Sequence, residues 1–175
     1  MKKIFALLCA VLLLSVSFAS AENGTVVEFR DNLLLNGTLP DGYRFSLKSQ
    51  TDLTLEGEII SDDAAAPVLE VYIAFNESFA QAESLKNLDE GTLGLVKQGF
   101  SEENSVTFEL FDTASGDSLL MIREAGGQFL DFYTVCAGYE IELTLFPAEG
   151  QVLTDAQVSQ FVELIRNMDI VPVKG

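Results

Sequence analysis

The chain contains no histidine and no tryptophan, and only two of its 175 residues are cysteine, Cys9 and Cys136. Without histidine there is no serine–histidine or cysteine–histidine nucleophile pair and no histidine-ligated zinc, copper or non-haem iron site. Glycine-rich loops of the kind that bind phosphate or dinucleotides are also missing. These absences exclude most enzyme chemistry, and we expect no catalytic residue, no cofactor and no metal ion.

Basic residues are scarce: ten lysines and arginines stand against 27 aspartates and glutamates, giving a formal net charge of −17 at pH 7. A surface of this charge repels phosphate backbones, which excludes nucleic acid as a partner. Net charge mainly keeps a protein soluble, although it also attracts cations and basic partners. We therefore expect a protein or small-molecule partner, whose identity the sequence leaves open along with the oligomeric state.

The amino end has the three-part pattern of a cleavable export signal. Two lysines at positions 2 and 3 precede the apolar run Ile4–Leu14, which is about half the ~20 apolar residues of a membrane span. Small residues follow at Ala19–Ala21, where signal peptidase would cleave after Ala21. The pattern predicts that residues 1–21 are a bacterial signal peptide and that the protein is secreted or periplasmic, with no membrane attachment after cleavage.

Cleavage would also change the composition of the working protein. Cys9 lies inside the apolar run and would be lost, leaving Cys136 without a disulfide partner and expected to be buried and unreactive. Two of the ten basic residues would be lost as well, so eight would face 27 acidic ones, a formal charge of −19. Residues 22–175 have the length of one domain, and we expect a single globular domain in which residues 22–38 are a loosely ordered lead-in.

Alternating apolar and polar residues, together with short and mostly apolar runs, predict a series of strands after this lead-in. The strands are expected at residues 43–48, 53–59, 68–75, 106–112, 118–123, 128–136 and 139–146. Short turns rich in glycine, serine and aspartate separate the last four, which is typical of antiparallel hairpins.

Two helices interrupt and end this series. Asp89 is a candidate N-cap for the first, and Thr154 with Gln157 forms a capping box for the second. Their apolar faces are expected to be Leu93, Val96 and Phe100 in the first, and Val158, Phe161, Ile165 and Met168 in the second. The order of elements predicts an α+β fold: an antiparallel sheet of about six to seven strands packed with two main helices.

The strand that opens after Leu39-Pro40-Asp41-Gly42, and the terminal helix that ends in Met168-Asp169-Ile170-Val171, resemble the PsbP/Mog-type fold group. That group includes PsbP-like proteins and DcrB-like exported bacterial proteins, and the resemblance covers most of residues 39–173. It implies an α/β/α sandwich and an accessory or binding role rather than an enzymatic one. The group has no shared catalytic motif to transfer to this chain, and a shared fold does not fix function.

The candidate binding patch consists of Arg123, Glu140 and Glu142. The two glutamates share one face of a predicted strand, and Arg123 ends another apolar run, so the three would form one surface if both strands present them on the same side. We expect an exported, non-enzymatic accessory or binding domain. A carboxylate-dependent hydrolase, and a weak calcium-binding module using the acidic loops at residues 61–67 and 112–117, remain open as alternatives.

Overall fold

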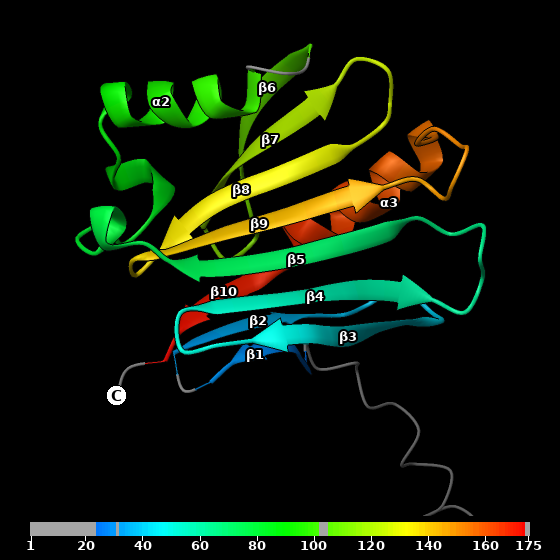
Figure 1. Cartoon of the computed structure of the whole chain (residues 1–175), viewed down its shortest axis with the longest axis horizontal. Helices are drawn as coiled ribbons and strands as arrows, with labels where there is room; N and C mark the ends of the chain where they lie inside the picture. The colour runs from blue at the N-terminus through cyan, green and yellow to red at the C-terminus, as the bar shows by residue number, and fades with distance from the viewer. Residues whose placement is uncertain (1–23, 31, 102–104, 174–175) are drawn as a thin grey trace, which may run out of the picture.

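The computed structural model describes residues 24–30, 32–101 and 105–173, so the predicted signal peptide lies outside the described residues. A seven-stranded and a three-stranded sheet, both antiparallel, pack with two α-helices (Figure 1). This is the α+β class that the sequence predicts. Within the described ranges, no helix has both the length and the apolar character to cross a membrane.

The large sheet has the strand order β3-β4-β5-β9-β8-β7-β6. Its strands are β3 (Tyr43–Gln50), β4 (Thr54–Ser61), β5 (Val68–Phe75), β6 (Val106–Asp112), β7 (Ser118–Glu124), β8 (Leu130–Cys136) and β9 (Tyr139–Phe146). The first three strands form one run of hairpins and the last four form another, and β5 pairs with β9 along its whole length to join the two runs. All seven predicted strands are confirmed, with ends that differ by at most two residues.

A small sheet with the order β1-β2-β10 contains β1 (Gly24–Phe29), β2 (Leu33–Gly37) and β10 (Asp169–Pro172). The expectation of a loosely ordered lead-in is therefore wrong for β1 and β2. Alternate residues of the two strands are fully buried, namely Val27, Phe29, Leu33 and Leu35. The error has a physical cause: β2 pairs with β10 at the opposite end of the chain, a contact that no local pattern reports.

One face of the large sheet is covered by the small sheet and by α3 (Asp155–Arg166), and the main core lies between them. The predicted capping box is present: the Thr154 hydroxyl accepts from the backbone N–H of Gln157, and the Gln157 side chain accepts from the backbone N–H of Thr154. Phe161 is fully buried and its ring meets that of Tyr43 edge to face at 5.6 Å. This packing holds α3 against the sheet.

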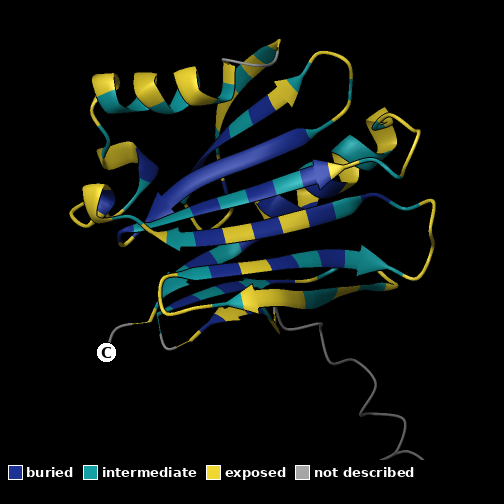
Figure 2. Ribbon diagram, in the orientation of Figure 1, coloured by how far each residue is buried: buried dark blue, intermediate teal, exposed yellow. Residues whose placement is uncertain are grey.

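The other face is covered only in part. The helix α2 (Glu90–Ser101), with the short 3-10 helices η1 (Glu77–Phe79) and η2 (Leu85–Asn87), packs over the β6–β7–β8 side. Asp89 is the N-cap of α2 as predicted, since its carboxylate accepts from the backbone N–H groups of Gly91 and Thr92 at 2.8 and 3.0 Å. Beyond α2, exposed or half-buried residues alternate with buried ones along β9, β5 and β4, and the edge strand β3 contains no buried residue (Figure 2).

Gly57 in β4 gives a test of packing in the large sheet. A Cβ atom at this position would lie 2.4 Å from two atoms of the Phe45 ring and 3.1 Å from the carbonyl oxygen of Ser46. Gly57→Ala should therefore lower the free energy of unfolding by about 1–3 kcal/mol in a denaturant titration, the usual cost of overpacking. Combining it with Phe45→Leu should cost less than the sum of the two single changes. An unchanged midpoint for Gly57→Ala would contradict this packing.

Candidate functional site

The uncovered part of the large sheet carries two adjacent rows of polar side chains that run across its strands. We call the side chains of these rows, together with Glu140, the acidic face. In register across β4, β5, β9 and β8, the first row is Glu58, Glu70, Thr144 and Asp131, and the second is Glu56, Tyr72, Glu142 and Tyr133. Cross-strand neighbours share one side of a sheet, so all of these residues face the side on which α2 lies.

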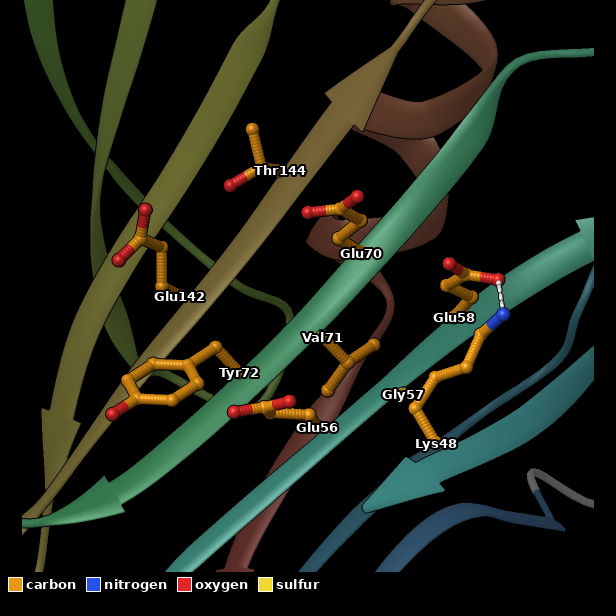
Figure 3. A pocket seen from close by; sticks show the side chains of 9 residues that line it. All are labelled: Lys48, Glu56, Gly57, Glu58, Glu70, Val71, Tyr72, Glu142 and Thr144. Carbon is orange, nitrogen blue, oxygen red and sulfur yellow. Dashed lines mark ion pairs between the residues drawn. The ribbon is translucent and has the colours of Figure 1, made fainter.

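A shallow hollow of about 350 Å³ lies over the centre of the acidic face (Figure 3). Side chains from β3, β4, β5 and β9 surround it, and the backbone of Gly57 and Val71 contributes to its lining. Lys48 is the basic residue of this hollow, and its ammonium group lies 2.8 Å from the carboxylate of Glu58. One cation thus offsets one of the four glutamates that line the hollow.

Glu70 stands among like charges. It lies directly opposite Glu58 on β4, and Glu142 lies one row away on β9. Partial burial raises the pKa of Glu70, the negative charges of Glu58 and Glu142 raise it further, and Lys48 opposes them. Like charges directly opposite each other destabilise a sheet, so this arrangement costs folding free energy that a bound cation would recover.

Asp131 is a carboxyl group placed inside the fold. It lies in the middle of β8, a strand buried along its entire length, and its exposed fraction is 2%. Burial raises its pKa well above the usual range, and the charge of Glu142 and a hydrogen bond with that carboxylate raise it further. Thr144 donates a hydrogen bond to it at 3.3 Å. Because an ionised carboxylate is costly to bury, Asp131 keeps its proton and donates it in a hydrogen bond to Glu142.

Glu140 is held in place by two donors. The Tyr133 hydroxyl donates to one carboxylate oxygen at 2.7 Å, and the Asn76 side-chain amide donates to the other at 2.8 Å. Burial raises the pKa of Tyr133, and the hydrogen bond to Glu140 and the nearby carboxylates raise it further, so the phenol stays neutral. The Tyr133 ring also contacts Phe100 of α2 edge to face at 5.8 Å. Glu140 is therefore a carboxylate oriented by two hydrogen bonds at the edge of the α2 layer.

A second hollow of about 290 Å³ lies between α2 and the carboxylates of β9. Its lining residues are Leu95, Val96, Gly99, Phe100, Tyr133, Glu140 and Glu142. Glu142 also lines the first hollow, so the two hollows meet at this side chain. One wall is thus apolar and the other acidic.

Arg123 does not belong to this surface. It pairs in register with Leu130, whose other partner is Leu145, and both leucines are fully buried in the core on the α3 side. Arg123 therefore points to the face opposite Glu140 and Glu142, so the structure brings the two glutamates together and separates the arginine from them. Its direct cross-strand neighbours are Thr107 and Leu130, so neither register position places a carboxylate opposite Arg123.

In the acidic loops considered for calcium binding, carboxylates are paired with donor groups of the protein itself. Asp62 pairs with Arg44, and Asp63 accepts from the backbone N–H of Ala65. Asp112 accepts from Ser118 and pairs with Lys86. Within the described ranges, no group of three or more potential ligands is arranged to hold a metal ion.

Cys136 is buried on the core side of β8, as expected for a structural cysteine. Burial raises the pKa of its thiol to about 11, with a smaller contribution from the charge of Asp117. At neutral pH it is therefore a protonated, unreactive thiol.

Reasoning from the sequence found Glu140 and Glu142 but missed most of the acidic face. The missed residues are Glu56, Glu58, Glu70, Tyr72, Asp131, Tyr133 and Thr144. A local signal existed for one of them, because an aspartate in the middle of an otherwise apolar strand needs a polar partner. For the others, only strand order shows that residues as distant in the sequence as Glu70 and Glu142 lie on neighbouring strands.

The raised pKa of Asp131 predicts a specific pH dependence of stability. Folded Asp131 keeps a proton that the unfolded state loses near the ordinary aspartate pKa of 3.8. The stability that this proton contributes is complete below pH 3.8 and is lost as the pH rises through the folded-state pKa of Asp131. Asp131→Asn keeps a neutral hydrogen-bond donor for Glu142, so the variant should not lose this stability as the pH rises. We expect denaturant unfolding from about pH 4 to 8 to show a flatter decline for the variant than for the wild type. Parallel profiles would contradict a protonated Asp131.

Comparisons with known proteins place no relative beside this site. No protein-family model matches the chain, and no curated protein matches it. The function is therefore argued from the chemistry of the two hollows and of their carboxylates.

Proposed function

We propose that this protein is an exported, non-enzymatic binding domain and that its acidic face binds a positively charged ligand. The observation that carries the proposal is the position of Glu70, opposite Glu58 and beside Glu142 on a sheet face that the described elements leave open. Such an arrangement costs stability in the free protein and is relieved when a cation binds.

Three features of the sequence fit this proposal. The signal-peptide pattern of residues 1–21 supports action outside the cytoplasm, in the periplasm or after secretion. The resemblance to PsbP-like and DcrB-like proteins supports an accessory or binding role by analogy of fold. The excess of 27 acidic over ten basic residues would also speed the approach of a cation through long-range attraction.

Spermidine is a suitable first probe because it is a small, soluble organic cation. We expect calorimetric titration at low ionic strength to show binding that weakens as salt is added. Glu70→Gln and Glu142→Gln should each weaken it about fivefold, the size expected when one charge-assisted contact in a partly exposed site is lost.

Glu83→Gln is the matched control, because it makes the same change of charge at an exposed residue outside both hollows. It should change spermidine affinity by less than about twofold. Equal losses in all three variants would mean that spermidine senses only net charge. That result, or no binding at all, would overturn the assignment of the acidic face as the site.

A carboxylate-dependent hydrolase is the second candidate, and one observation favours it. Asp131, whose pKa is raised, is hydrogen-bonded to Glu142, so two carboxyl groups lie side by side as in the carboxyl pairs used in glycoside hydrolysis. Against it, Asp131 is 2% exposed and its proton is already donated to Glu142, so it presents little surface to a substrate.

A screen with chromogenic glycosides decides between the two candidates. We expect no turnover by the wild type above the background of the Glu140→Gln/Glu142→Gln double variant, because the binding-domain proposal gives neither glutamate a catalytic role. Turnover that the wild type shows and the double variant loses would replace the binding proposal with the hydrolase.

A further inference from the structure

The hollow beside α2 differs from the rest of the acidic face because its helix side is apolar. Leu95 projects from α2 with 70% of its surface exposed, and Val96 and Phe100 line the hollow next to it. A large apolar side chain that is this exposed to water contributes little hydrophobic stabilisation to the fold. Bound apolar groups would gain free energy by covering it.

The mouth of this hollow carries negative charge. Glu142 stands where the two hollows meet, and Glu140 is oriented beside it by Tyr133 and Asn76. Tyr72 lies in register with Glu142 on the next strand and is 40% exposed. A carboxylate next to an accessible aromatic ring suits an alkylammonium group, which gains from the ion pair and from the electron-rich ring face.

We propose that the hollow between α2 and β9 binds an amphipathic organic ammonium compound, with the charged nitrogen at Glu142 and the hydrocarbon part along Leu95 and Phe100. The inference rests on the proposed function and narrows its ligand from any cation to one with an apolar chain. The volume of about 290 Å³ lies near the lower limit for small-molecule sites, which fits a single chain.

The glycines of α2 are consistent with this occupant. Gly99 lines the hollow, and a Cβ atom built there would meet nothing within 4 Å. Gly94 is equally open but is absent from the lining. Glycine weakens a helix by about 1 kcal/mol relative to alanine, so helix stability does not explain why position 99 is a glycine. It leaves space for the ligand where a side chain would fill it.

A compact inorganic cation or a basic protein fits less well. No described group of three or more carboxylates is placed to hold a metal ion. A basic protein surface would pair with the carboxylates of the acidic face but would not need the apolar wall at Leu95. The hydrocarbon chain of an amphipathic ammonium covers that wall while its head group reaches Glu142.

The experiment compares two quaternary ammonium probes, octyltrimethylammonium and tetramethylammonium, by calorimetric titration of the wild type and two leucine variants. The octyl compound should bind at least about tenfold more tightly, because its chain is buried while the head groups match. Gly99→Leu fills the hollow and should remove this preference. Gly94→Leu makes the same change outside the hollow and should keep it.

Leu95→Gln gives an independent check, because it removes the apolar wall at an exposed helical position and should reduce octyl affinity while leaving that for tetramethylammonium unchanged. Thermal melting of each variant shows that it is folded. Equal affinity for the two probes, or loss of the octyl preference in Gly94→Leu as much as in Gly99→Leu, would overturn the inference. Spermidine binding that depends on Glu142 would in that case leave the proposed function standing, whereas loss of both would refute the two together.

Discussion

The structure depends on β8, a strand that is buried on both faces over all seven of its residues. Hydrogen bonds to β7 and β9 fix it in the sheet, α3 and the small sheet lie over one side, and α2 with its neighbouring 3-10 helices lies over the other. A polar side chain in such a strand must find its partner within the protein. Asp131 is hydrogen-bonded to Glu142 and Thr144 on β9. A carboxyl group in the core is thereby linked directly to a carboxylate of the acidic face.

The two faces of the large sheet are covered unequally, and this decides where a site can form. The core-side face is closed by apolar packing and presents Arg123 at its margin. On the other face the cover ends over β8, so the carboxylates of β9, β5 and β4 meet solvent while the edge of α2 stands beside them. An acidic surface and an apolar wall therefore share one boundary, and Glu142 lies on it. The proposed ligand matches this boundary with a charged nitrogen at one end and a hydrocarbon chain at the other.

Local patterns were enough to predict most of the elements. Alternation identified the half-buried strands of the large sheet because their two faces meet different surroundings, and short apolar runs marked the rest. Thr154 with Gln157 marked the start of α3 because unpaired N–H groups at a helix start need acceptors. The strands β1 and β2 escaped prediction because their pairing depends on β10 at the far end of the chain. The candidate site was half right for a similar reason. Glu140 and Glu142 share a strand, whereas the face that Arg123 presents depends on the register of β7 with β8.

The sequence by itself determined the α+β class, the two helices, the buried thiol and a composition without histidine. Only the tertiary structure decided that Glu58, Glu70 and Glu142 stand side by side and that a helix edge with exposed Leu95 borders them. The physical reason is the range of the interactions. Alternation and capping act between residues a few positions apart, whereas the electrostatics of the acidic face arise between strands that meet only after the whole sheet has formed.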